Sequence, residues 1–321
     1  MHVPNTQWMH IISQASVNME QLLNPLTLEQ LINILRTNQR ACTTIGHDFI
    51  VQLGMIYMDM LHVYKCISEQ VSAAINMSGP MALEQSMVKG MKLVKKEVLK
   101  LISTWVARSN DPQTVIVNFI PPLLDAVLLD YQQAPPDARD AEVLATMATI
   151  VNRLQQFLSV EIVLNIFSAV FEPTIQMITM VMCTATRREH AGAGRQSPIF
   201  LRLFFNPFFL SVSPTQDFEQ YPDHRVTFYQ LLLAITTHCF PAYCALTPAQ
   251  FETVVDAIVW AFKHPIRHVA ETGLKIMKQL LDKVVQAPDF AQNFFAKFFL
   301  SILQHMFAVV TDSTHFSGLI D

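Results

Sequence analysis

Apolar residues recur at intervals of three and four along most of the chain, which is the spacing of one face of an α-helix. Within the first hundred residues this pattern breaks at Asn24-Pro25, at Gly46 and at 78–80, where proline and glycine are typical stop signals. The pattern therefore predicts four helices in this part of the chain, over residues 6–23, 27–44, 48–77 and 81–108.

The same spacing continues beyond residue 108. The run Asn110-Asp111-Pro112 is typical of a helix cap followed by proline at the first helical position. Pro121-Pro122 is expected to break the helix that follows it. We expect further helices over residues 113–133, 137–157, 160–178, 223–239, 248–263, 266–286 and 288–310.

These segments amount to about twelve helices, or roughly six pairs of about 47 residues, and no strand is predicted. HEAT and armadillo repeats have this period, and each of their helix pairs buries its apolar face only against its neighbours. The predicted fold is all-α, an α-solenoid of HEAT-type helix pairs in a right-handed superhelical arch. A globular helical bundle is the alternative.

Residues 180–216 do not fit the helical pattern, and they divide the chain into predicted arrays at 1–179 and 217–321. The stretch contains two of the eight glycines, followed by a run rich in Phe, Leu, Ser and Pro. Codons for these residues can be pyrimidine-rich and Gln216 can be encoded by CAG, as at the 3′ end of an intron. We interpret the stretch as an atypical insertion, disordered or encoded by a retained intron.

A functional interpretation of the same stretch stays open. Arg187, Arg188 and Arg195 would form a basic localisation patch, and the phenylalanines that follow would form a binding or membrane-surface loop. If exposed, these rings would promote aggregation. They are Phe200, Phe204, Phe205, Phe208 and Phe209.

Composition narrows the classes of function. The chain of 321 residues is 51% hydrophobic and 15% charged, which excludes intrinsic disorder as its general state. Only 8 glycines argue against an all-β fold and against a nucleotide-binding α/β fold. A net charge of −4 gives no basic footprint for nucleic acid.

The cysteine content and the hydropathy indicate the redox compartment of the protein and whether it spans a membrane. Five cysteines, an odd and low number, indicate free thiols in a reducing compartment. Residues 1–7 show no signal peptide, and the sequon at Asn76 is expected to be unused. The mean hydropathy of +0.29 raises the possibility of a membrane span, but Glu172-Pro173 interrupts the apolar run at 162–186. We predict no span.

No catalytic, cofactor-binding or metal site is predicted. The chain has no phosphate-binding glycine loop, no nucleophile elbow and no Cys-x-x-Cys. His238, Cys239 and Cys244 lack a fourth zinc ligand, so buried thiols are the better interpretation. His264 and His268 are interpreted as a helix junction, because Pro265 lies between them.

Lysines and core residues give further expectations. The lysines at 89, 92, 96 and 100 form a basic stripe, with Lys95 beside it, which could meet acidic protein or phosphate but is more typical of a solvated helix face. Six apolar side chains on helix faces are predicted to lie in the core. They are Met55, Met58, Met60, Trp8, Trp105 and Trp260.

Several segments resemble the C-terminal portion of the exportin-1 family, nuclear export receptors of the importin-β/karyopherin superfamily. They include the run from Gln52 to Cys66, Leu99-Lys-Leu-Ile-Ser-Thr-Trp105 and the run from Asn118 to Tyr131. They also include Asp217-Phe-Glu-Gln-Tyr-Pro-Asp-His-Arg225, Trp260-Ala-Phe-Lys-His264 and the run from Leu303 to Asp312. The resemblance covers nearly everything except 180–216.

The resemblance implies a ring-like HEAT-repeat superhelix that binds leucine-rich export-signal cargo cooperatively with Ran-GTP and passes the nuclear pore. It implies Ran-GTP, cargo and nucleoporins as partners, shuttling between nucleus and cytoplasm, no cofactor and no enzyme activity. It assigns no residue of this chain to Ran or cargo, because contacts along a solenoid are diffuse.

The chain departs from the family pattern in its extent. It lacks the N-terminal repeats that bind Ran and the central repeats with the export-signal groove and its reactive cysteine. It stops near Ser313-Thr-His315, where the family continues. We therefore expect a fragment that binds no export signal alone and self-associates through apolar end faces, with Phe294, Phe295, Phe298 and Phe299 as candidates. A helical adaptor that binds proteins independently of Ran is the alternative.

Overall fold

The computed structural model describes residues 11–13, 22–187, 221–264 and 266–311, with side chains described as far as Ile178 in the second range. In this part of the chain the regular structure is helical throughout. The α-helices of its first half are α3 (Pro25–Ile45), α4 (Ile50–Ser78), α5 (Ser86–Arg108), α6 (Pro112–Thr114), α7 (Ile120–Gln133), α8 (Ala141–Leu154) and α9 (Val160–Arg187). Those of its second half are α11 (Pro222–His238), α12 (Pro241–Cys244), α13 (Pro248–Phe262), α14 (Arg267–Val285) and α15 (Pro288–Thr311).

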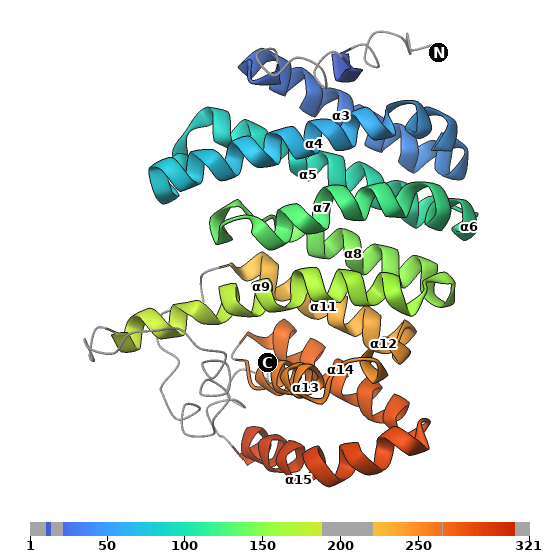
Figure 1. The fold of residues 1–321 in the computed structure, drawn as a ribbon, viewed down its shortest axis with the longest axis vertical. Coiled ribbons are helices and arrows are strands. Elements are labelled where there is room, and N and C mark those ends of the chain that lie inside the picture. Colours follow the sequence, from blue (N-terminus) through green and yellow to red (C-terminus); the bar gives the residue numbers. More distant parts are fainter. Residues whose placement is uncertain (1–10, 14–21, 188–220, 265, 312–321) are drawn as a thin grey trace. The chain divides into compact units, whose positions relative to one another are not determined.

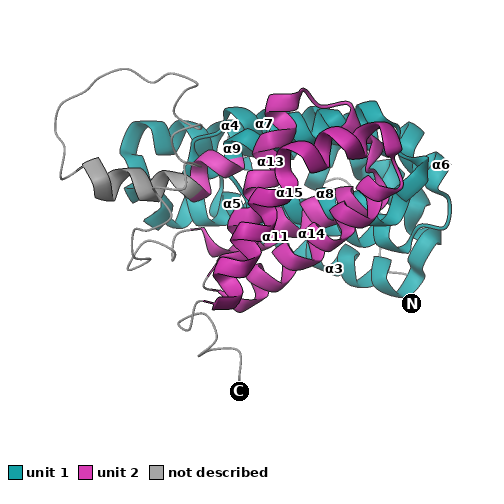
Figure 2. Ribbon diagram, turned by 90° about the horizontal axis from the view of Figure 1, so that it is seen from below, with its two compact units in different colours: residues 1–173 teal, residues 174–321 magenta. Residues whose placement is uncertain are grey.

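Short helices of other pitch connect several of these elements. Four are 3₁₀-helices: η1 (Gly46–Phe49), η2 (Gly79–Glu84), η4 (Pro136–Ala138) and η5 (Gln155–Phe157). The fifth, η3 (Val115–Phe119), is a π-helix. The chain forms two compact units, Met1–Pro173 and Thr174–Asp321, which Figure 2 colours separately.

The first unit has two layers of helices (Figure 1). Helices α3, α5 and α8 are neighbours in one layer, and α4 and α7 are neighbours in the other. Neighbouring helices within a layer run parallel, because residues further along one helix contact residues further along the other. Arg36 on α3 pairs with Glu97 on α5, and Gln39 with Thr104. This arrangement is the one that stacked helix pairs produce.

The second unit repeats the arrangement. Helix α14 packs against α11, α13 and α15. The aromatic ring of Phe251 on α13 meets three rings of α15, with centroid distances of 5.0, 6.1 and 5.9 Å to Phe290, Phe294 and Phe298. Contacts between helices consecutive in the chain join α4 to α5, α13 to α14 and α14 to α15. An all-α helical-repeat fold is confirmed, and the arch with its handedness stays a prediction.

Helix ends follow the local signals in the sequence. Asn24 caps α3 by accepting the amide of Leu26, and Gly46 ends that helix with a φ of +73°, which glycine adopts without strain. Asp111 accepts the amide of Thr114, so the predicted cap before Pro112 is confirmed. Thr247 forms a capping box with Gln250 at the start of α13.

Several predicted boundaries differ from the structure. The helix expected from residue 81 begins at Ser86, because η2 first carries the chain out of the Gly79 turn. The helix expected from residue 137 begins at Ala141, after η4, and Asp140 caps it. The helix expected to end at Ile178 continues to Arg187, into the predicted insertion, and residues 188–216 lie outside the described residues.

The break predicted at Pro121-Pro122 is wrong, because the helical stretch runs without interruption from Pro112 to Gln133. The α-helical winding instead changes to the π-helix η3 just before the two prolines. Its wide turn is closed by the amide of Ile120, which donates to the carbonyl of Val115 five residues earlier. Pro121 and Pro122 lack amide protons and could not complete an ordinary α-turn on the carbonyls four residues before them. The wider turn leaves Phe119 buried, and its carbonyl accepts the hydroxyl of Tyr57 on α4.

Helices α13 and α14 approach closely at Gly273. A Cβ atom there would lie 2.5 Å from the backbone nitrogen of Phe262 and 2.7 Å from the Cβ of Ala261. Real Cβ atoms do not approach backbone so closely, so this crossing needs glycine at the contact point.

The core predictions have mixed outcomes. Trp105 and Met60 are buried as expected, while Trp260 is half-buried and Trp8 lies outside the described residues. The prediction is wrong for Met55 and Met58, which are 57% and 62% exposed. Helix α4 is apolar almost all round, and its buried positions are 53, 56, 57, 60, 61, 63, 64, 67, 68, 71 and 75.

The expected exposed phenylalanine face on α15 is wrong in part. Phe294 and Phe298 are buried against Phe251 of α13, and Phe295 is half-buried. Phe299 is 45% exposed, as expected. The error arose because four nearby phenylalanines occupy two faces of one helix.

Three described helical stretches are long and apolar enough to cross a membrane: Pro112–Gln133, Val160–Ile178 and Pro288–Thr311. Half or more of the first two is buried inside the protein, against 11% of the third. The absence of a membrane span stays a prediction.

Candidate protein-binding groove

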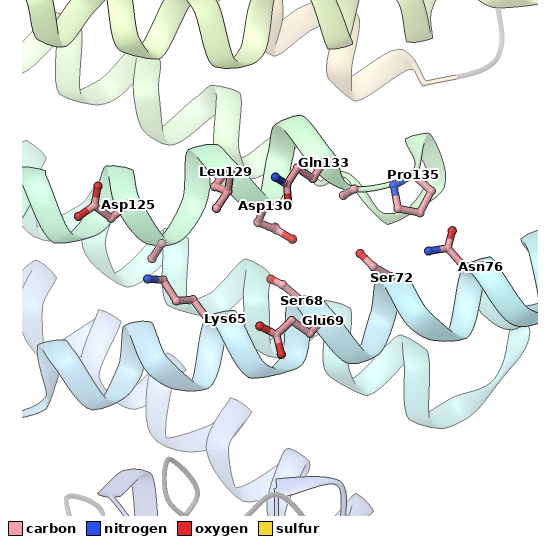
Figure 3. A pocket seen from close by; sticks show the side chains of 12 residues that line it. Lys65, Ser68, Glu69, Ser72, Asn76, Asp125, Leu129, Asp130, Gln133 and Pro135 are labelled. Carbon is pink, nitrogen blue, oxygen red and sulfur yellow. The ribbon is translucent and has the colours of Figure 1, made fainter.

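An open groove of about 440 Å³ lies between α4 and α7 in the first unit (Figure 3). Its α4 wall is formed by Lys65, Ser68, Glu69, Ser72 and Asn76. Its opposite wall is formed by Asp125, Ala126, Leu129, Asp130 and Gln133 of α7, with Ala134 and Pro135 of the following turn. Most of these side chains are polar, so the groove is suited to polar groups of a ligand.

Helical periodicity places the groove residues. Residues 65, 69, 72 and 76 follow one another at intervals of four and three, so they share one face of α4. The adjacent face of this helix holds buried Tyr57 and Tyr64. On α7, residues 125, 129 and 133 repeat every four positions in the same way. Helix α7 ends at Gln133 because Ala134 is extended before Pro135, which closes one end of the groove.

A buried ion pair forms the floor. The Nζ of Lys95 on α5 lies 2.9 Å from Oδ2 of Asp130, and the two side chains are 2% and 14% exposed. The same oxygen accepts the hydroxyl of Tyr64 at 3.2 Å, and the Lys95 ammonium lies 5.0 Å from the centre of the Tyr64 ring. Burial, together with the negative charge of Asp130, raises the pKa of Tyr64, which stays a neutral donor.

Ser68 adds an unsatisfied polar group to this floor. Its side chain is 3% exposed and points into the groove in Figure 3. The hydroxyl lies beside that of Tyr64 and opposes the rise of its pKa, but it makes no hydrogen bond of ordinary geometry. A buried hydroxyl without a hydrogen-bond partner costs free energy, so a ligand group that bonded to it would gain binding free energy.

The lysine stripe of α5 is largely occupied inside the protein. Lys89 is exposed and pairs with Glu84 at 2.8 Å, as a solvated face would allow. Lys92 instead donates to the carbonyl of Asp137 at 2.7 Å, and burial lowers the pKa of Lys92. Lys96 and Lys100 are half-buried near Glu142 on α8. The solvated-face interpretation therefore holds for Lys89 and is wrong for Lys92.

The histidine and cysteine candidates show no ligand chemistry. In the described part of the chain no three acidic, histidine or cysteine side chains are grouped so as to hold a metal ion. Cys239 is buried as expected, whereas Cys244 is exposed, so the buried-thiol interpretation is wrong for Cys244. Partial burial raises the pKa of both thiols. The Nδ1 of His264 accepts the amide of Ile266 at 3.0 Å, which fits the predicted helix junction.

Charged groups also line the contact between α13 and α15 in the second unit. Glu252 pairs with Lys297 at 2.9 Å, and the Nζ of Lys263 lies 3.5 Å from Nδ1 of His305. Asp256 lies one helical turn beyond Glu252. Burial, and next the charge of Glu252, raise the pKa of Asp256 to about 7, against the lowering effect of Lys297.

The sequence did not indicate the groove. One signal for its floor was present, because Lys95 falls on the apolar face of α5 beside Met91, Val94 and Val98. A lysine in such a place needs a buried acidic partner, which is Asp130 here. The pairing of α4 with α7 across more than sixty residues gave no local signal.

Comparison with known proteins identifies related chains. A family model described as CRM1 C terminal matches residues 52–183 and 204–321. The unmatched residues 184–203 lie within the predicted insertion, but the match extends into both of its ends, at 180–183 and 204–216. The chain is 44% identical to Exportin-1 of Drosophila melanogaster over 320 residues, which are 99% of this chain and 27% of that protein.

Relatives from other organisms give similar matches. Exportin-1 of Schizosaccharomyces pombe is 39% identical over 319 residues, and Protein EXPORTIN 1B of Arabidopsis thaliana is 38% identical over 318. Each alignment covers 99% of this chain and 26% of the relative. The chain spans about a quarter of the length of the curated relatives it matches.

Proposed function

The chain belongs to the CRM1 family of exportins, and from this membership we propose that it forms part of a nuclear export receptor. The observation that carries the proposal is 38–44% identity over 99% of the chain to relatives from fly, fission yeast and plant. The whole receptor would carry proteins with leucine-rich export signals out of the nucleus together with Ran-GTP. It would meet nucleoporins and shuttle between nucleus and cytoplasm.

The helical repeats suit a binding role without catalysis. Successive helices of one layer contact only their neighbours and present a row of side chains that a large partner can touch at many points. In this proposal Ran-GTP and cargo strengthen each other's binding through a shared coupling free energy in the receptor. GTP hydrolysis would then belong to Ran.

A chimera tests the proposal. The aligned stretch of Drosophila Exportin-1 is replaced by this chain, and the chimera is expressed in cells depleted of their own Exportin-1. The readout is the location of a fluorescent reporter that carries both a nuclear import signal and a leucine-rich export signal. We expect a cytoplasmic reporter, as with the parent Exportin-1. A nuclear reporter, with the chimera expressed and soluble at the parent's level, would refute the proposal.

The same proposal makes a prediction for the chain alone. Because the family resemblance places the export-signal groove in other repeats, a fluorescent export-signal peptide should show no saturable binding by anisotropy. Saturable binding in the micromolar range would contradict this expectation.

A second candidate is a helical adaptor that binds partners independently of Ran. The observation that favours it is the α4–α7 groove with its unsatisfied hydroxyl at Ser68, which needs no other part of a receptor. Partner binding to the chimera, measured with and without Ran loaded with a non-hydrolysable GTP analogue, separates the two. The adaptor requires equal binding in both conditions, whereas the receptor requires stronger binding with Ran.

A further inference from the structure

The polar floor of the α4–α7 groove has unused bonding capacity. Oδ2 of Asp130 already accepts two hydrogen bonds, from Lys95 and Tyr64, while Oδ1 has no hydrogen bond among the described residues. Ser68 beside them offers a hydroxyl that can also accept. The side chains of Ser68 and Asp130 both point into the groove (Figure 3). The hydroxyl of Ser68 and Oδ1 of Asp130 therefore face the same space, and neither accepts a hydrogen bond of ordinary geometry from a described residue.

The walls add an excess of negative charge. The Lys95–Asp130 pair is neutral as a unit, so the charge of the groove depends on Lys65, Glu69 and Asp125. These give two negative charges and one positive charge. None of the three forms an ion pair with another described residue, and Glu69 and Asp125 are exposed on opposite walls. A cation that entered the groove would meet carboxylates on both sides and acceptors beneath.

We propose that this groove receives an arginine side chain of a partner protein. The inference rests on the protein-binding role proposed above and names the chemistry of one contact. Arginine carries five donors in a planar fork, which can reach the hydroxyl of Ser68, the free oxygen of Asp130 and the carboxylate of Glu69 together. Lysine offers a single point charge, and a phosphate or an anionic membrane would be repelled by the two wall carboxylates.

The dimensions of the groove agree with this occupant. Its volume of about 440 Å³ lies within the range of ligand sites, about 300–1,000 Å³. The methylene stem of an arginine can lie along the apolar part of the α7 wall at Leu129, whose side chain is 55% exposed. The guanidinium would then reach the floor while the partner's backbone stays outside.

Ligand-observed NMR tests the proposal on the full chain. The probe is the tripeptide acetyl-Gly-Arg-Gly-amide, and saturation-transfer titration measures its dissociation constant. Two further peptides replace arginine by lysine or by citrulline, which keeps the shape of arginine but carries no charge. We expect millimolar binding, with the arginine peptide at least about tenfold tighter than the citrulline peptide and tighter than the lysine peptide.

Two variants test whether the arginine peptide binds in the groove. Glu69→Gln removes a wall charge, and Ser68→Ala removes a hydroxyl that makes no internal hydrogen bond, so both should fold normally. Each should weaken the arginine peptide by about three- to tenfold. Glu29→Gln is the matched control, since Glu29 is an exposed acid on α3 that does not line the groove. It should leave binding unchanged.

Two results would overturn the inference. Equal affinity for the arginine and citrulline peptides would show that charge recognition is absent. Arginine binding that survives both Glu69→Gln and Ser68→Ala, or that falls equally in Glu29→Gln, would place the peptide elsewhere on the surface. Neither result bears on export by the chimera, so failure of the groove and failure of the receptor role are distinguishable.

Discussion

The crossing of α13 and α14 predicts that Gly273→Ala destabilises the second unit. The new methyl group would lie 2.5 Å from the nitrogen of Phe262 and 2.7 and 2.8 Å from two carbons of Ala261. Carbon contacts are comfortable at about 3.5–4.0 Å, so the two helices would have to separate by about 1 Å. Overpacking costs about 1–3 kcal/mol, and the better helix propensity of alanine returns up to about 1 kcal/mol. Because the obstacle is backbone, we expect a net loss of about 2 kcal/mol.

The chain offers a control with the opposite sign. Gly54 lies inside α4, and a Cβ there meets no atom within 4 Å. Gly54→Ala therefore changes only the backbone entropy of the unfolded chain and the helix propensity, and should stabilise the first unit by about 0.5–1 kcal/mol. The same chemical change is thus expected to act in opposite directions at the two sites.

Urea unfolding followed by tryptophan fluorescence measures both effects. Trp260 on α13 reports on the second unit and Trp105 on α5 on the first, with Trp8→Phe as the common background. With a slope of about 2 kcal/mol per molar urea, Gly273→Ala should lower the midpoint of the Trp260 transition by about 1 M. An unchanged or higher midpoint would refute the argument that this crossing requires glycine.

Three further predictions concern buried charges and a cap. Lys95→Met leaves the Asp130 carboxylate buried without its cation and should lower the free energy of unfolding of the first unit by about 3 kcal/mol. The double variant Lys95→Met with Asp130→Leu should lose clearly less. Equal losses of stability in urea unfolding would contradict this prediction. The raised pKa of Asp256 means that the folded state holds a proton more tightly than the unfolded state, so this group makes stability fall as the pH rises from about 4 to about 7. Asp256→Asn should remove this pH dependence and stabilise the second unit at pH 8 by about 1 kcal/mol, a value reduced for the partial exposure of the side chain to solvent. If the melting temperature of the variant depends on pH as steeply as that of the parent, Asp256 is not the cause. Thr247→Ala removes the capping box of α13 and should cost about 1 kcal/mol, while Thr247→Ser in the same thermal melts should cost much less.

The sequence predicted the helices well because their signals are local. Gly46 and Asp111 act within one helical turn, and the structure confirms the ends that they mark. Trp105 was correctly placed in the core because its helix has a clear apolar face. Met55 was not, because α4 is apolar on more than one face and local spacing does not say which face meets α5 and α7.

The groove was beyond the reach of the sequence for a different reason. Its walls come from helices about sixty residues apart, and its floor comes from a third helix, α5. The lysine stripe of α5 stood out in the sequence, but the lysine that forms the groove floor is Lys95 beside the stripe, which pairs with Asp130. Only the packing of the layers showed that Ser68 is buried without a hydrogen bond.

The wide turn of η3 has a consequence for how the length of this gene can change. Removing one codon inside an α-helix rotates the residues before the deletion by about 100° relative to the residues after it, and a packed face is lost. The π-turn at Val115–Phe119 contains one residue more than an α-turn, so after deletion of exposed Asn118 the bond from Ile120 to Val115 would close an ordinary α-turn, with Val115 and Phe119 three apart on one face. Among orthologous genes, single-codon gaps in this part of the array are therefore expected to fall within these five positions.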